Sequence, residues 1–237
     1  HVIHEWLNEK NSVSAVQDED SSSASVNPFS IADICSTSSD LVKIINSEGV
    51  SFVTRPDYFD EDDFDGLVAE CGCPISDESL EVLLNAVRIY EAECTAAAYL
   101  YRAEHSRFQL EFKLKKKGFL AFEINPALDY LEEKGLLDDE RFAGAWLNTR
   151  VISKKEGRNR LASELALRGV SFKIVEDVLN EFFSEHSEED ICRKALKKQL
   201  INGVDKPRLM RKMYRLGFSV STVNICLEEL ENITDSF

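Results

Sequence analysis

The chain has 237 residues, enough for one large domain or two to three small ones. It contains no apolar run of the roughly 18 residues that a membrane span needs, and its first residues lack the apolar core of a signal peptide. We therefore predict a cytoplasmic protein with no membrane segment. The formal net charge is −15, which as a total argues against a polyanionic partner.

The charge is distributed unevenly along the chain. Residues 1–100 contain 20 Asp and Glu against 4 Lys and Arg, whereas residues 101–237 contain 23 against 24. The basic residues of the second part gather in clusters, among them KLKKK at 113–117, KKEGRNR at 154–160 and KPRLMRK at 206–212. Contact with phosphates depends on such local clusters rather than on net charge, so a nucleic-acid partner stays open.

The N-terminal part divides into an arm and a small extension. Residues 10–40 are rich in Ser and Asp and lack apolar periodicity, so we predict that residues 1–40 form an acidic, disordered arm. The segment LVKIINSEGVSFVTR then predicts a β-hairpin with its turn at Glu48–Gly49. The acidic run that follows lacks the twelfth ligand of a calcium loop, because Gly72 stands there, and it indicates an acidic helix start instead. We assign the hairpin and this helix to residues 41–85.

From Ser76 onward the pattern predicts consecutive helices with clear start and stop signals. Ser76 and Ser106 are candidate N-caps, and Ser106-Arg-Phe-Gln109 has the form of a capping box. Pro207 stands where the first turn of a helix tolerates it. Three glycines each follow a short amphipathic run, as a residue just past a helix end would: Gly118, Gly169 and Gly217.

Alignment on these glycines shows an internal repeat of about 50 residues. Eight residues before the glycine the three copies have Leu110, Leu161 and Leu209, and apolar residues also agree six, ten and thirteen residues after it. Each copy is predicted to be three helices, the first at roughly 86–103, 139–153 and 188–201. The repeats are placed at 86–137, 138–186 and 187–237. The predicted fold is mainly α, with tandem three-helix, helix-turn-helix-like repeats in a curved elongated stack after the small β-containing extension.

Catalytic and metal motifs are missing from the sequence. It has no phosphate loop, no GxGxxG, no HExxH and no GxSxG, and the six cysteines form no CxxC pair. Cys71 and Cys73 are at most half of a metal site, and His105 and His186 each precede a capping serine at a repeat boundary. We therefore predict no enzymatic activity, no cofactor and no metal.

The three basic clusters recur in register, on or beside the second helix of each repeat. A single charged run is usually only a solvated face, but three in register would line one groove with cations suited to a phosphate backbone. No clear set of base-reading side chains accompanies them, which favours shape- or backbone-directed binding over base-specific reading.

One long motif runs from Gly135 to Ala143 (GLLDDERFA), continues to Arg150, and ends in GRNRLASELALRGV at 157–170. This motif resembles the RecX family, regulators of the RecA recombinase. The upstream segment RAEHSRFQLEFKLKKKGF is similar to a second family motif, and the resemblance covers about 42–231. The chain departs from the family in lacking a second arginine soon after Arg150, and its acidic arm has no counterpart.

The resemblance implies a modular three-helix repeat protein that binds the groove of the RecA–DNA filament, with single- or double-stranded DNA inside it, and we expect the chain to act as a monomer. It would restrain filament growth, ATP turnover and strand exchange, and so modulate recombinational repair and the SOS response. Phe142 and Trp146 are assigned to the core, since they sit one helical turn apart. The predicted contact residues are basic: Lys115, Lys116, Lys117, Arg150, Lys154, Lys155, Arg158, Arg160, Arg168, Lys206, Arg208, Arg211 and Lys212.

Two functions of other classes stay open. The chain would be a helix-turn-helix DNA-binding protein if it acts without a recombinase, and a helical-repeat adaptor if its repeats bind only another protein. Binding to naked duplex and inhibition of a recombinase ATPase separate these three hypotheses.

Overall fold

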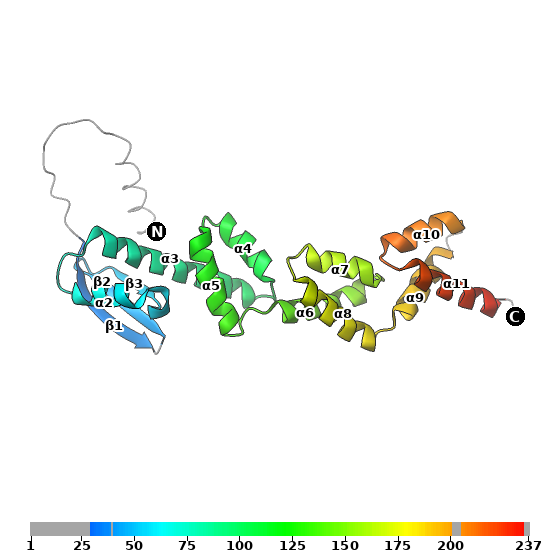
Figure 1. Cartoon of the computed structure of the whole chain (residues 1–237), viewed down its shortest axis with the longest axis horizontal. Coiled ribbons are helices and arrows are strands. Elements are labelled where there is room, and N and C mark those ends of the chain that lie inside the picture. The colour runs from blue at the N-terminus through cyan, green and yellow to red at the C-terminus, as the bar shows by residue number, and fades with distance from the viewer. Residues whose placement is uncertain (1–28, 39, 201–204, 235–237) are drawn as a thin grey trace, which may run out of the picture.

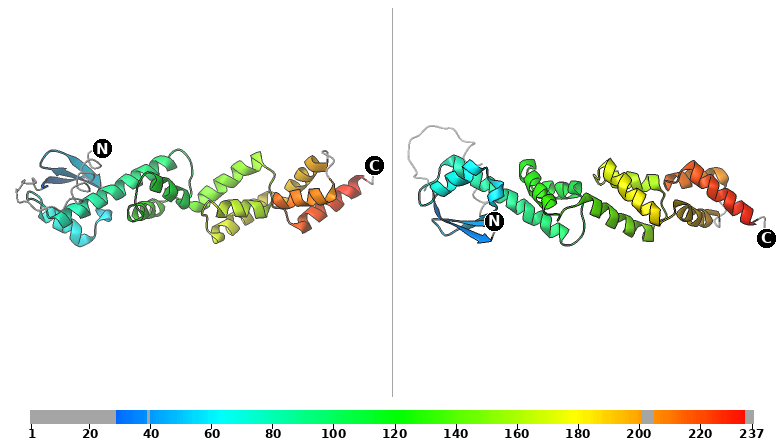
Figure 2. Two further views of the ribbon diagram at one scale, coloured as in Figure 1. Left: turned by 90° about the horizontal axis from the view of Figure 1, so that it is seen from above. Right: turned by 60° about the horizontal axis from the view of Figure 1, so that its bottom comes forward.

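A computed structural model describes residues 29–38, 40–200 and 205–234 of the chain. These residues form an elongated row of helical units with a small β-sheet at the N-terminal end (Figures 1 and 2). The predicted fold, mainly α-helical with a β-containing N-terminal extension, is confirmed.

The extension is built on a three-stranded antiparallel sheet in the order β1-β2-β3, with β1 at Ile31–Ser38, β2 at Leu41–Asn46 and β3 at Ser51–Thr54. The predicted hairpin corresponds to β2 and β3. Its turn is closed by the Asn46 side chain, whose Oδ1 accepts hydrogen bonds from the backbone of Glu48 and Val50 at 3.1 and 2.7 Å. Gly49 takes the positive φ of +81° that this tight turn requires.

Strand β1 corrects the prediction of a disordered arm through residue 40. The strand is rich in Ser and polar residues, so its own sequence gives little β signal. Its stability comes from the hydrogen-bond ladder with β2 and from the complete burial of Ile31 against the sheet's core cluster. The rest of the predicted arm, residues 1–28, lies outside the described residues.

The acidic helix start is confirmed as α2 at Glu61–Ala69, which follows the short 3-10 helix η1 at Pro56–Tyr58. Three acidic residues occupy the first turn of α2, where the positive end of the helix dipole favours them. Helix α3 runs from Asp77 to Leu100, with Ser76 accepting a hydrogen bond from the backbone of Ser79 as predicted. It begins well before residue 86 because its first turns pack against the sheet through Leu80, Leu83 and Leu84.

A buried ion pair joins the extension to the first repeat. Arg55, which follows β3, makes two hydrogen bonds of 2.7 Å to Glu93 on α3, and the Tyr58 hydroxyl donates to the same carboxylate at 2.6 Å. The hydrogen bond to Glu93 raises the pKa of the Arg55 guanidinium. Its carbon also lies 4.0 Å from the ring centroid of Tyr130 in the first repeat. The extension is therefore held to the repeats by a charge-assisted contact whose carboxylate is almost fully removed from water.

Three helices follow one another in each repeat unit. The first unit comprises the C-terminal part of α3 with α4 at Arg107–Lys116 and α5 at Ala121–Glu133. The second unit comprises α6 at Asp139–Ser153, α7 at Arg158–Ala166 and α8 at Phe172–Glu185. The third unit comprises α9 at Glu188–Leu200, α10 at Lys206–Arg215 and α11 at Val220–Thr234. Each unit has a hydrophobic cluster of its own, and the leucines eight residues before the glycines are buried in all three. These separate cores support the proposed division into residues 86–137, 138–186 and 187–237.

Neighbouring repeats are joined at the glycine turns. The Ser106 hydroxyl, at the start of α4, donates a 2.6 Å hydrogen bond to the carbonyl of Arg168, just after α7. One repeat further, the backbone N–H of Gly157, at the start of α7, donates to the carbonyl of Leu216 at 2.8 Å. The second helix of one repeat thus abuts the glycine turn of the next repeat at both junctions.

Carboxylates reinforce both junctions in the same way. The first backbone N–H of α4, from Arg107, donates to Asp139 at the start of α6 at 2.8 Å. The first backbone N–H of α7, from Arg158, donates to Glu188 at the start of α9 at 2.9 Å. Each acid satisfies an N–H that has no partner within its own helix, and its negative charge lies at the positive end of that helix's dipole.

Candidate functional site

The second helices of the three repeats lie along one side of the stack, the upper side in Figure 1. We call α4, α7 and α10, with the turn that follows each, the second-helix row. The head-to-tail junctions produce this alignment, since each second helix begins where the next repeat's glycine turn lies. The row carries ten of the thirteen predicted contact residues: Lys115, Lys116, Lys117, Arg158, Arg160, Arg168, Lys206, Arg208, Arg211 and Lys212.

Arg158 is tied to its own repeat. Its Nη2 lies 3.0 Å from Glu176 Oε2 and 2.7 Å from Asn180 Oδ1, both on α8. The repeat-equivalent Arg107 makes the same kind of contact, with Asp129 and Glu132 on α5. Arg158 therefore braces α7 against α8, a structural function that its position in the sequence pattern did not indicate.

Arg160 and Arg168 share one carboxylate. Glu164 forms ion pairs with Arg160 at 2.5 Å and with Arg168 at 2.8 Å, each four residues away on the helix surface. The hydrogen bond from Arg168 lowers the pKa of the Glu164 carboxyl, and so the carboxylate is held in its charged form. Together the three side chains contribute one net positive charge to the row rather than two.

Arg150 lies beneath the row, at the C-terminal end of α6. It makes a two-pronged contact with Glu156, with Nε to Oε2 at 2.6 Å and Nη2 to Oε1 at 3.2 Å. This hydrogen bonding raises the pKa of the Arg150 guanidinium. The guanidinium groups of Arg150 and Arg168 lie 5.2 and 4.8 Å from the ring centroid of Trp146. The ring is partly buried against the core of the middle repeat and Phe142 is buried in it, so the prediction that both aromatics pack in the core is confirmed.

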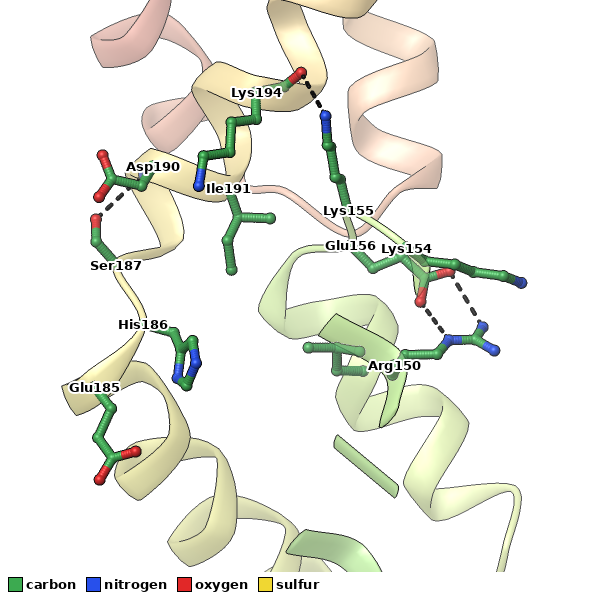
Figure 3. A pocket seen from close by; sticks show the side chains of 11 residues that line it. Arg150, Lys154, Lys155, Glu156, Glu185, His186, Ser187, Asp190, Ile191 and Lys194 are labelled. Carbon is green, nitrogen blue, oxygen red and sulfur yellow. Dashed lines mark hydrogen bonds and ion pairs between the residues drawn. The ribbon is translucent and has the colours of Figure 1, made fainter. Parts of the chain in front are cut away.

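Lys154 and Lys155 border a pocket of about 350 Å³ at the junction of the second and third repeats (Figure 3). One wall is formed by Arg150 at the end of α6 and by Glu156 in the loop after it, and the other is the connection from α8 to α9, with His186. The Lys155 ammonium reaches across and donates to the backbone carbonyl of Lys194 at 3.5 Å. The predicted residues Arg150, Lys154 and Lys155 are thus brought together here, below the second-helix row.

Lys194 adds a cation to this pocket that the sequence pattern did not identify. It stands on α9, outside the basic clusters that recur beside the second helices. Only the tertiary packing of α9 against the loop after α6 brings it near Lys154 and Lys155. No signal in the sequence alone distinguishes it from an ordinary solvated lysine.

The predicted cations of α10 are accessible to a partner. Lys206, Arg208, Arg211 and Lys212 are all exposed, and Arg208 pairs with Asp205 only at the helix surface, at 3.3 Å. At the other end of the row, Lys115 forms an i,i+4 ion pair with Glu111, whereas Lys116 and Lys117 are exposed.

The described residues contain no group of three or more His, Cys, Asp and Glu placed to hold a metal ion. In the same part of the chain, no helix has both the length and the apolar character needed to cross a bilayer.

The fold and this surface define a tandem three-helix repeat protein with a cationic face. A family model described as "RecX, second three-helix domain" matches residues 138–179. The regulatory protein RecX of Treponema pallidum (strain Nichols) is 41% identical over 152 residues, covering 64% of this chain and 93% of that protein. The RecX protein of Caldanaerobacter subterraneus subsp. tengcongensis is 28% identical over 168 residues, covering 71% and 85%. The chain belongs to the RecX family of regulatory proteins.

Solved structures agree on the fold. A crystal structure of a regulatory protein RecX superposes with a TM-score of 0.65 at 17% identity, covering 84% of this chain and 99% of that one. The RecX structure from Lactobacillus salivarius gives a TM-score of 0.55 at 18% identity, covering 61% and 97%. At these identities the likeness concerns the fold.

Proposed function

We propose that this protein regulates a RecA-type recombinase by binding its filament on DNA through the second-helix row. In doing so it restrains filament growth, ATP turnover and strand exchange, and modulates recombinational repair and the SOS response. The proposal places the protein in the cytoplasm, acting as a monomer without catalysis or a cofactor of its own.

The observation that carries the proposal is the alignment of α4, α7 and α10 along one side of an elongated stack. A filament presents the same surface at regular intervals, and a stack of equivalent repeats can meet it at several of them. The exposed cations at both ends of the row suit the phosphate backbone of filament-bound DNA or an acidic protein surface.

The proposal is tested by the ATPase activity of a RecA-type recombinase on single-stranded DNA, with and without this chain. We expect inhibition at stoichiometric or lower ratios. The double charge reversal Arg211→Glu and Lys212→Glu should weaken inhibition, because these side chains are exposed and contribute nothing to the repeat core. Lys134→Glu, at an exposed position after α5, is the matched control and should inhibit like the wild type.

Absence of inhibition by the wild-type chain would contradict the proposal. Tight, salt-sensitive binding to naked duplex would then favour a DNA-binding protein that acts alone, with a salt slope of about −0.9 per phosphate contact. Absence of any DNA binding would favour the adaptor.

A further inference from the structure

An exposed aromatic surface lies at the junction of the first and second repeats. Phe108 and Phe112, one turn apart on α4, are 51% and 55% exposed, and Phe172 at the start of α8 is 81% exposed. Gly169, in the turn between α7 and α8, lies against the Phe108 side chain, and Phe172 follows three residues later in the chain. We call Phe108, Phe112 and Phe172 the aromatic platform.

An aromatic ring is not a common feature of the repeats at the positions of Phe108 and Phe112. At the position of Phe112 the other two repeats have Ser163 and Arg211, six residues before the glycine in each case. At the position of Phe108 they have Asn159 and Pro207. A large apolar ring that is half exposed gives up much of the stability its burial would provide, so its presence only in this repeat points to a ligand that covers it.

The charges around the platform identify the kind of ligand. The Lys116 ammonium lies 4.5 Å from the centroid of the Phe112 ring, and Lys117 follows it at the helix end. Within the described residues, neither lysine has a carboxylate at ion-pair distance, whereas the nearby Lys115 and Arg107 are neutralised by acidic partners. The platform therefore presents aromatic faces beside cations that have no carboxylate partner in the part of the chain that the structure describes.

We propose that the aromatic platform binds single-stranded DNA, with bases stacked on Phe112 and Phe172 and phosphates held by Lys116 and Lys117. Aromatic rings interleaved with cations are the arrangement that holds unpaired bases, since every base has a π face and every linkage an anion. Duplex DNA is a poor ligand for it, because its base faces are covered by their neighbours. The choice of DNA over RNA rests on the proposed function, whereas the stacking of bases on the rings is inferred independently of that function.

Leucine and tryptophan substitutions at one position test the stacking. Phe112→Leu keeps an apolar side chain but has no π face, so the affinity for a fluorescein-labelled oligothymidylate, measured by anisotropy on the full chain alone, should fall about tenfold. Phe112→Trp should bind like the wild type, and its added indole fluorescence should be quenched when a base stacks on it. Phe122→Leu, at a 51% exposed phenylalanine on α5, is the matched control and should bind normally.

Four results would overturn the platform. They are no binding of oligothymidylate by the wild type, equal binding by Phe112→Leu, full competition by duplex of the same length, and loss of binding in the control Phe122→Leu as well. The recombinase ATPase assay separates this inference from the proposed function. Wild-type chain that binds oligothymidylate but does not inhibit the recombinase contradicts only the proposed function. If Phe112→Leu lowers inhibition while oligothymidylate binding is unchanged, the rings contact protein and the platform is refuted.

Discussion

Replacing Gly169, in the turn after α7, by alanine should destabilise the protein more than the same replacement of Gly118, in the equivalent turn after α4. Both glycines adopt a left-handed conformation, with φ of +81° and +90°. Alanine at either position should cost about 1–2 kcal/mol in free energy of unfolding, because an L-residue is strained there. At Gly118 a new Cβ would meet nothing within 4 Å, whereas at Gly169 it would overlap the Cβ and Cγ of Phe108.

The overlap adds a second cost to Gly169→Ala. Displacing the Phe108 side chain from a packed junction should add about 1–3 kcal/mol, the usual cost of overpacking. The Ser106 hydrogen bond to the Arg168 carbonyl lies at the same contact and should weaken as the repeats move apart. Gly169→Ala is therefore expected to lower the free energy of unfolding by about 2–5 kcal/mol, against about 1–2 kcal/mol for Gly118→Ala.

Urea titration followed by circular dichroism measures the difference, with the slope of the transition checked for constancy between the variants. Adding Phe108→Ala to Gly169→Ala should recover only part of the loss, since alanine removes the Cγ and Cδ1 that the new Cβ meets but keeps the Cβ. Equal destabilisation by Gly169→Ala and Gly118→Ala would refute the view that this glycine is required by the approach of the neighbouring repeat.

Two further predictions concern the charge pairs of the middle repeat. Arg150→Met should destabilise the protein by about 2–3 kcal/mol in urea titration, because it leaves the 8% exposed Glu156 without its counter-charge. Adding Glu156→Met should restore most of the lost stability, and no recovery would contradict the view that the unpaired carboxylate causes the loss. Glu164 has a pKa lowered by Arg168, so its contribution to stability is fully present above its ordinary value of 4.5 and is lost as the pH falls from there through its lowered folded value. Glu164→Gln should therefore reduce the acid sensitivity of the melting temperature in that range, and an unchanged pH profile would argue against the pairing.

Much of the fold could be predicted because its signals are local. The capping serines at 76 and 106 and the positive-φ glycines act on backbone groups a few residues away, and the structure confirms them. The leucines that repeat in register show which face of each helix is buried. Strand β1 could not be predicted, because its stability depends on the partner β2 rather than on its own residues.

The candidate site was less accessible from sequence. The pattern identified where the arginines of the middle repeat stand but not which are neutralised: Arg158 binds α8, while Arg160 and Arg168 share Glu164. Lys194 lies far along the chain from Lys155 and approaches it only through packing of α9. Ion pairs and pockets depend on distances between helices, and those distances cannot be predicted from the sequence of any one segment.

By itself the sequence determined the three-helix repeat, its period and the side of each second helix that packs inward, since apolar spacing and backbone preferences are properties of neighbouring residues. The tertiary structure alone decided that the second helices align in one row and that each glycine turn receives the start of the preceding repeat's helix. It also decided which cations remain exposed. Those outcomes follow from contacts between residues some 40 to 60 positions apart, such as Ser106 with Arg168, where geometry rather than local pattern selects the partner.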